Sequence, residues 1–225
     1  MPLTQEPSPR SEPAPRRPRQ RRKEARPGEI IDAALALWAE QGFAATRLEA
    51  VATRAGIAKG TIYLYFPSKE ALFEAALRDR IGGTLASVGA QLPELEGSLE
   101  AELGLLLHAI YDRLLETDSA ALLKVLIGEG HRFPGLVELY REVALASGLG
   151  MVRRILERAA QRGELRLPPE AVDPRMVVAP AIAAAVWRML FGVGPSLDRT
   201  AYEKAHLDLV LRGLLVEPCS TTQSP

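Results

Sequence analysis

A helical spacing of apolar residues runs through most of the chain between residues 28 and 215. Leu, Ala, Glu and Arg dominate this region, and no run sustains the alternation of apolar and polar residues that marks a half-buried strand. A chain of this kind can bury its apolar faces only by packing helices against one another. We therefore predict an all-α protein of about nine helices, in which an N-terminal three-helix helix-turn-helix domain precedes a larger helical domain.

The composition is that of a soluble globular protein, with 47% hydrophobic and 25% charged residues among 225. The single cysteine, Cys219, can form neither an internal disulfide nor a cysteine-based zinc site, and the three histidines lack HExxH spacing, so we expect no metal and no cofactor. The N-terminal stretch lacks the apolar region of a secretory signal, and the longest apolar run, 176–187, is shorter than the roughly 18 residues of a membrane span. We expect a cytoplasmic protein with no membrane partner.

The chain divides into four segments. Residues 1–26 are rich in Pro and Arg and carry eight basic against three acidic side chains, so we expect a disordered arm that either contacts a polyanion or is merely solvated. We place a helix-turn-helix domain at 27–75, with its motif at about 47–66, and a larger helical domain at 76–217. The remainder, 218–225, is expected to be a disordered tail.

Turn residues mark the helices of the first domain. We expect a helix over about 28–41, closed by Gly42. A capping box at Thr46–Glu49 opens a short second helix that stops at Gly56. The third helix spans about 58–66 before Pro67, which has no N–H to continue it.

The later helices follow from the same signals. Ser68 is the expected N-cap of a long fourth helix, and Asp173-Pro174 is the expected start of another. The helices after the third are expected at about 69–92, 98–116, 119–131, 134–162, 174–191 and 200–215.

The third helix has two faces. Ile62 and Phe66, four residues apart, are expected to point inward, whereas Gly60 and Leu64 point outward. Two short helices joined by a glycine turn are typical of the helix-turn-helix motif, whose second helix reads base edges in the DNA major groove. A glycine in a helix costs about 1 kcal/mol relative to alanine, which makes sense where the backbone must approach another surface closely.

The outward side chains suit contact with DNA. Lys59 can reach the O6 or N7 atom of guanine, and the methyl group of Thr61 can touch a thymine methyl. Tyr63 suits the rim of the interface, with its ring against a sugar and its hydroxyl on a phosphate. The alternative is a helical hairpin whose aromatic residues only fill the core.

Residues from about 27 to 80 resemble the DNA-binding domain of TetR/AcrR-type transcriptional regulators. The stretch that carries the resemblance is IIDAALALWAEQGFAATRLEAVATRAGIAKGTIYLYFPSKEALFEAAL. The resemblance implies that operator DNA is bound and that Thr46, Tyr65 and Lys69 contact phosphates. The full set of expected DNA-binding residues is Thr46, Arg47, Lys59, Gly60, Thr61, Tyr63, Leu64, Tyr65 and Lys69.

Two positions depart from the family pattern. Ala58 stands where the family often has a capping Ser, so the recognition helix lacks a cap that is typically worth about 1 kcal/mol. Leu64 stands where many relatives carry a polar residue, so we expect it to touch a methyl group or to make no base contact.

The rest of the chain resembles the family only in its all-helical architecture, and the resemblance implies that 76–217 is an effector-binding and dimerisation domain. The alanine-dense stretch APAIAAAVWRML and the apolar stripe of AYEKAHLDLVLRGLL could form a four-helix interface between two copies, or could face only the core of their own domain. The expected dimer residues are Ala181, Ala184, Ala185, Ala205, Leu209, Leu211 and Leu214.

A small-molecule effector is implied by the resemblance. A site of this kind combines an apolar cavity with a few polar groups, so we selected polar or aromatic residues that lie in apolar surroundings. The expected pocket residues are His108, Tyr111, His131, Phe133, Met151, Trp187 and Arg188.

These observations predict a ligand-responsive repressor that binds a palindromic operator as a homodimer. The repressor sign and the ligand control follow from the resemblance alone. A helix-turn-helix adaptor that binds a protein partner is one alternative, and an enzyme built on the helical body is another. We expect no enzyme, because the sequence shows no catalytic histidine motif, no glycine-rich phosphate loop after a strand and no G-x-S-x-G elbow.

Overall fold

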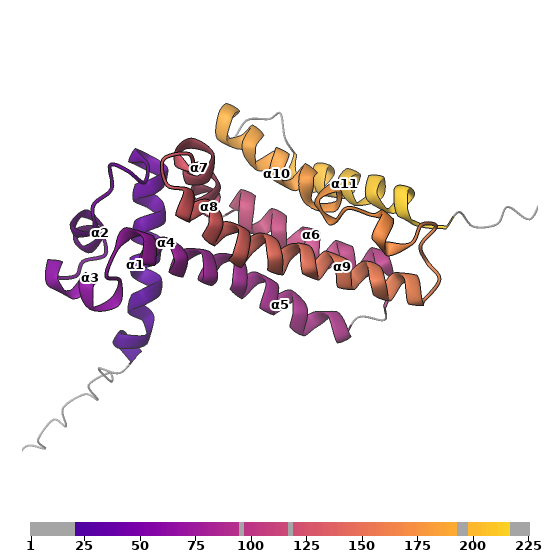
Figure 1. Cartoon of the computed structure of the whole chain (residues 1–225), viewed down its shortest axis with the longest axis horizontal. Helices are drawn as coiled ribbons and strands as arrows, with labels where there is room; N and C mark the ends of the chain where they lie inside the picture. The colour runs from indigo at the N-terminus through magenta and orange to yellow at the C-terminus, as the bar shows by residue number, and fades with distance from the viewer. Residues whose placement is uncertain (1–20, 95–96, 117–118, 193–197, 217–225) are drawn as a thin grey trace, which may run out of the picture.

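The computed structural model describes residues 21–94, 97–116, 119–192 and 198–216, and its regular elements are helices (Figure 1). The prediction of an all-α protein is confirmed. The helices are α1 (Arg21–Gln41), α2 (Leu48–Arg54), α3 (Lys59–Tyr65), α4 (Lys69–Leu77), α5 (Gly83–Gln91), α6 (Leu99–Glu116), α7 (Ala120–Glu129), α8 (Pro134–Tyr140), α9 (Ala146–Gln161), α10 (Pro174–Phe191) and α11 (Arg199–Leu214).

Two of the expected long helices contain a π-helical insertion. The segment η1 (Arg78–Gly82) joins α4 to α5, and η3 (Arg141–Leu145) joins α8 to α9. Both joints keep helical backbone angles, so the described residues form nine continuous rods, as the sequence predicted. Short 3-10 turns follow α5 at Leu92–Glu94 and precede α10 at Pro169–Ala171.

Most of the expected helix ends are confirmed. The Ser68 hydroxyl accepts a hydrogen bond from the backbone N–H of Ala71 at 3.1 Å, and the Asp173 carboxylate accepts one from that of Arg175 at 2.9 Å. Gly56 has a φ of +66°, a left-handed conformation that glycine adopts without strain.

Two expectations about the first domain are wrong. Helix α1 begins at Arg21 rather than near residue 28, so the end of the expected arm is helical. The expected capping box does not form, because α2 begins after Arg47, whose side chain makes no capping bond. Thr46 is buried, and its hydroxyl donates to the Gly42 carbonyl at 2.7 Å, which satisfies an acceptor at the end of α1 instead.

The helix-turn-helix domain and the rest of the protein share one hydrophobic core. Trp38 and Phe43 pack with Phe73 of α4, with ring centroids 5.6 to 5.8 Å apart, and Phe133 before α8 reaches Phe43 at 5.1 Å. Buried residues of α7 and α8 belong to the same cluster. The two domains therefore meet through α1, α4, α7 and α8, as Figure 1 also shows.

Helix α6 lies at the centre of the larger domain and packs against α5, α9, α10 and α11. Its Tyr111 is fully buried and donates its hydroxyl to Nδ1 of His206 on α11 at 2.9 Å. Nε2 of His206 donates in turn to the Val177 carbonyl of α10 at 3.0 Å. This chain of bonds fixes how the last two helices lie on α6.

We expect Ile62→Ala to lower the free energy of unfolding by about 2–5 kcal/mol, the usual result of emptying a core site. Ile62 is 0% exposed, whereas Leu64, two residues later on α3, is 84% exposed. Leu64→Ala is the matched control and should change the free energy by less than about 0.5 kcal/mol. Urea denaturation of both variants measures the difference, and equal losses would contradict the orientation of α3.

Candidate DNA-binding surface and effector cavity

Helix α3 presents one face to the core and the other to solvent. Ile62 and Phe66 are buried, as predicted, whereas Lys59, Gly60 and Tyr63 are exposed. The exposed side of α3 lies at the far end of the molecule from α11 (Figure 1). A helix of seven residues with an unpartnered outer face fits the recognition helix of a helix-turn-helix protein.

Gly60 is not required by the packing or the backbone conformation of the chain. A Cβ atom built at this position would meet no heavy atom within 4 Å, so packing does not require a glycine here. Its φ is also not in the left-handed range, unlike that of Gly42 or Gly56. Internal packing and backbone conformation therefore do not account for this glycine, and its place on the outer face of α3 agrees with close approach to another molecule.

Glu49 of α2 holds two of the expected DNA-binding residues. Its carboxylate accepts from the Tyr63 hydroxyl at 3.0 Å and pairs with Nζ of Lys59 at 3.2 Å. Its own backbone N–H and these two partners hold the pKa of the Glu49 carboxyl below its usual value. Sequence reasoning missed this role and read Glu49 only as part of a cap. The carboxylate preorganises both side chains on the outer face.

The two expected phosphate contacts nearest the turn after α1 are occupied within the protein. Thr46 is buried by its bond to Gly42, as described above. Nζ of Lys69 donates to the carbonyls of Phe43 at 2.8 Å and Ala44 at 3.2 Å, and lies 4.7 Å from the centre of the Phe43 ring. Both side chains thus stabilise the turn between α1 and α2.

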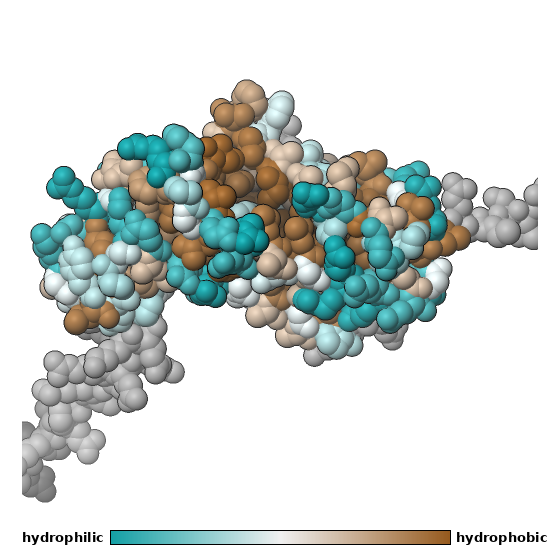
Figure 2. Space-filling model, in the orientation of Figure 1, coloured by the Kyte–Doolittle hydropathy of each residue, from teal (hydrophilic) through white to brown (hydrophobic). Residues whose placement is uncertain are grey.

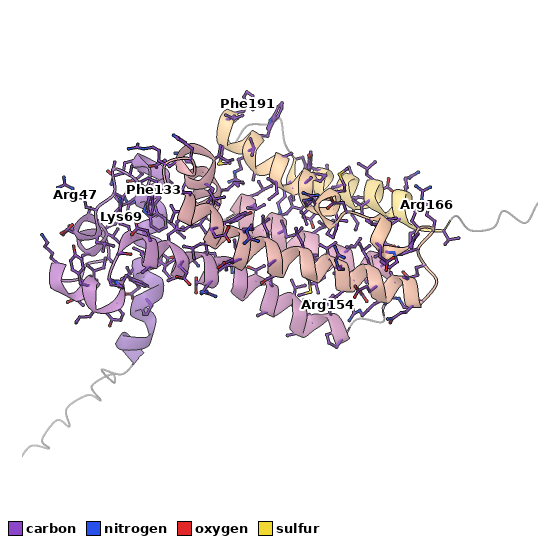
Figure 3. The ribbon with its side chains drawn as sticks, viewed as in Figure 1. Arg47, Lys69, Phe133, Arg154, Arg166 and Phe191 are labelled. Atoms are coloured by element: carbon purple, nitrogen blue, oxygen red, sulfur yellow. The ribbon has the colours of Figure 1, made fainter. Side chains whose placement is uncertain are left out.

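The other expected DNA-binding residues lie near the outer face. Arg47 is exposed and points away from the larger domain in Figure 3. Thr61 is half-buried, and Leu64 is the most exposed large apolar residue on α3. Tyr65 is half-buried and packs against the core, with its ring 6.5 Å from that of Phe66.

A carboxylate of the larger domain holds the turn that precedes α2. Glu129, at the end of α7, accepts from the backbone N–H groups of Phe43 at 2.5 Å and Ala44 at 2.8 Å. Gly42 has a φ of +83°, and a Cβ there would lie 2.8 Å from Oε1 of Glu129. Lys124 of the same helix donates to the Ala39 carbonyl. Helix α7 therefore positions the helix-turn-helix directly.

A cavity of about 460 Å³ lies in the larger domain among α5, α6, α7, α9 and α10. Its wall is mainly aliphatic, and its charged groups are Arg80, Arg113 and Arg175. The size and lining are those of a small-molecule site. The other described residues that line it are Ile81, Thr84, Leu85, Leu106, Ile110, Leu114, Ser119, Leu122, Leu123, Tyr140, Ala144, Leu145, Gly148, Leu149, Val178, Ala179 and Ile182.

None of the seven expected pocket residues lines this cavity. Tyr111 is bonded to His206 in the core, and Phe133 packs on Phe43. Met151 faces a separate cavity of about 340 Å³ on the other side of α9.

The remaining pocket candidates lie at or near the surface. His108 is exposed and pairs with Glu203 at 2.9 Å, and His131 is exposed too. Trp187 and Arg188 lie near the end of α10, where the Trp187 ring packs on Phe191. Polar residues in apolar runs did not reveal the cavity, because its wall is built mostly from aliphatic residues that look like any core residue in sequence.

Most of the expected dimer residues are buried in the chain's own core. Those on α10, together with Leu211 and Leu214, are buried, and only Ala205 and Leu209 are exposed. The exposed apolar face of α10 is a different one. It is formed by Met176, Ala179, Ala183, Trp187, Leu190 and Phe191, which recur every three or four residues.

This face is visible as a hydrophobic area over the C-terminal part of α10 in Figure 2, and Phe191 projects from it in Figure 3. Sequence reasoning could have found the face by separating the two stripes of α10 instead of taking the alanine-rich one. Among the described helices, α10 alone is long and apolar enough to be compared with a membrane span, but one side of it packs on α6 and α9. No group of three or more metal-binding side chains occurs within the described ranges.

These features define a class, the helix-turn-helix DNA-binding regulators with a separate helical domain. Comparison with known protein families identifies the family of regulators to which the chain is similar. Residues 30–76 match the bacterial regulatory proteins of the tetR family, and residues 93–206 match the tetracyclin repressor-like C-terminal domain. The chain therefore belongs to the TetR family of transcriptional regulators, which are not enzymes.

Individual relatives agree with this assignment. The fatty acid metabolism regulator protein of Bacillus subtilis is 27% identical over 150 residues, which are 66% of this chain and 73% of that protein. The regulator RutR of Escherichia coli is 43% identical over 72 residues, 32% of this chain and 34% of RutR. The crystal structure of Bacillus subtilis FadR in complex with stearoyl-CoA has the same fold, with a TM-score of 0.72, 22% identity, and coverage of 83% of this chain and 98% of that one.

We expect Gly60→Ala to stabilise the protein and to weaken its binding to DNA. The new methyl group meets no atom of the chain, so helix propensity should raise the free energy of unfolding by up to about 1 kcal/mol. The same methyl group should hold α3 away from the groove. Urea denaturation and fluorescence anisotropy on operator DNA measure the two effects, and an alanine variant with unchanged DNA affinity would contradict this role for Gly60.

Proposed function

We propose that this regulator is a cytoplasmic repressor that binds a palindromic operator as a twofold dimer and is released by a small molecule in the cavity. The observation that carries the proposal is the outer face of α3, where Lys59, Gly60 and Tyr63 are exposed and the glycine serves no internal packing. A lysine that can donate to bases, beside a glycine that allows close approach of the backbone, suits contact with base edges in the major groove.

The side chains on the outer face have separate roles. Lys59 reads guanine, Thr61 and Leu64 touch methyl groups, and Tyr63 binds at the rim. Arg47 is exposed beside them and neutralises a phosphate. Glu49 holds Lys59 and Tyr63 on the outer face, so that less conformational freedom is lost when DNA binds.

The exposed apolar face of α10 supports the dimer. Trp187, Leu190 and Phe191 are 49%, 71% and 62% exposed, and Leu209 on α11 is 67% exposed. Apolar side chains gathered in this way usually mark an interaction surface. A second copy of the same pair of helices would cover them, and a twofold dimer would match a palindromic operator with half-sites about 34–36 Å apart or a multiple of that distance.

The cavity supports control by a ligand. Its aliphatic wall suits an apolar molecule, and its residues on α7 lie on the same helix as Glu129, which holds the turn before α2. A ligand that prefers one arrangement of α7 would shift the population of DNA-binding dimers through its differential affinity. Bacillus subtilis FadR, which has the same fold, was crystallised in complex with stearoyl-CoA, and this supports an acyl chain as the apolar part of the effector.

The operator assay uses fluorescence anisotropy on DNA taken from upstream of the protein's own gene. We expect binding that survives competitor DNA and weakens steeply with salt, because each phosphate contact releases counterions. Lys59→Ala/Tyr63→Ala should lose this binding, whereas Arg153→Ala, an exposed change on α9, should retain it. If the double variant retained this binding, α3 would not read the DNA, and a helix-turn-helix domain that recognises a protein partner would be indicated instead.

The dimer assay uses size-exclusion chromatography with light scattering. We expect the wild-type protein to be a dimer and Leu190→Ser/Phe191→Ser to be a monomer that also loses affinity for a two-half-site operator. Ile127→Ser removes an apolar residue of α7 that is 61% exposed and is the control, with the dimer retained. A dimer in the α10 variant would show that another surface joins the copies.

A further inference from the structure

Arg80 lies between the cavity and the DNA-binding domain. It belongs to the π-helical segment η1, which joins α4 of the helix-turn-helix domain to α5 of the larger domain. It lines the cavity, and its guanidinium also forms an ion pair with Asp32 of α1. A second carboxylate, Asp79 on the same segment, lies 3.4 Å away. Insertions of this kind in helices are frequent at functional sites.

The described wall of the cavity contains three arginines and no carboxylate. The Arg175 guanidinium donates three hydrogen bonds to the Asp173 carboxylate, at 2.5 to 3.0 Å. Nε of Arg113 donates to the Thr84 hydroxyl at 2.7 Å, and that hydroxyl donates to the Arg80 carbonyl at 2.8 Å. Arg175 and Arg80 are thus each paired with a carboxylate, so an anionic group that enters the otherwise aliphatic cavity must compete with one of these partners.

We propose that the cavity selects an apolar molecule with a carboxylate head. This carboxylate forms an ion pair with the Arg80 guanidinium and replaces Asp32 as its partner. The proposal rests on the proposed function, since it names the chemical class of the effector and the contact through which the effector acts. The pair joins α1 to η1, so its loss removes a link that holds the helix-turn-helix domain in its DNA-binding position.

The burial of the two partners favours this exchange. The Asp32 side chain is 68% exposed, whereas the Arg80 side chain is 20% exposed. A pair with one partner in water is weak, because solvent and salt screen it. A carboxylate inside the cavity is screened less and can form charge-assisted hydrogen bonds with the same guanidinium. The ligand carboxylate therefore competes with a weakly bound partner, and it approaches Arg80 from the cavity, where the charges are screened less.

The exchange predicts reciprocal coupling between ligand and DNA. A ligand that breaks the Arg80–Asp32 pair must lower operator affinity by the same factor by which the operator lowers the ligand's affinity. A neutral molecule of the same length contacts the aliphatic wall of the cavity but leaves the Arg80–Asp32 pair intact. It should therefore bind without releasing DNA. This difference separates the role of the head group from that of the apolar chain.

The test uses dodecanoate below its micelle concentration and dodecan-1-ol below its solubility limit, with binding measured by calorimetry and DNA release by anisotropy. We expect dodecanoate to bind about tenfold more tightly than dodecan-1-ol, the usual effect of one charge-assisted contact. Arg80→Gln should abolish that preference and leave dodecan-1-ol binding unchanged. Equal affinities in the wild-type protein, no binding of dodecanoate, or an unchanged preference in Arg80→Gln would overturn the ligand class.

Two carboxylate variants test the coupling. Asp32→Asn and Asp79→Asn each remove a competitor for Arg80, so both should strengthen dodecanoate binding severalfold. Only Asp32→Asn removes the link to α1, so it alone should lose most of the dodecanoate-induced change in operator affinity. Asp79→Asn is the matched control and should release DNA as the wild-type protein does. Full release by Asp32→Asn would overturn the coupling.

These measurements distinguish a wrong effector class from a protein that does not bind an operator. If the wild-type protein does not bind the operator, the proposed function fails, whereas calorimetry still decides whether Arg80 selects a carboxylate. If the operator binds normally and dodecanoate does not, the repressor stands and the effector class is wrong. Urea denaturation of each variant identifies any loss of binding that comes from unfolding.

Discussion

The helix-turn-helix domain depends on a hydrophobic core that it shares with the larger domain. Helices α2 and α3 have seven residues each, too few to be stable alone in water. The aromatic cluster of Trp38, Phe43, Phe73 and Phe133 joins α1 and α4 to the start of α8. The DNA-binding surface is therefore held by contacts that also respond to the arrangement of α7 and α8.

Helix α3 serves both stability and recognition, because its helical geometry places the residues for these two functions on opposite faces. Ile62 and Phe66 anchor the helix in the shared core, and Lys59, Gly60 and Tyr63 face outward. Glu49 of the neighbouring helix orders two of these side chains before DNA arrives. Rigid anchoring on one side reduces the entropy lost when the other side binds.

Within the described part of the chain, three side chains make polar contacts between the domains beside the shared core. Glu129 holds the turn before α2, Lys124 holds the end of α1, and Arg80 holds Asp32 in the middle of α1. The first two come from α7 and the third from η1, and both elements also contribute to the cavity wall. This arrangement lets a ligand act on the DNA-binding domain through short, direct links rather than through a long path.

The sequence by itself determined the all-α class, the order of the helices, the two faces of α3 and the caps at Ser68 and Asp173, because these depend on local spacing and backbone chemistry. It did not reveal which stripe of α10 is exposed, since both are apolar and only packing on α6 and α9 chooses between them. The cavity wall, and the meeting of Arg80 with Asp32 across 48 positions, were likewise decided by tertiary structure. Helical periodicity specifies which side of a helix is buried, but the partner that buries it comes from elsewhere in the chain.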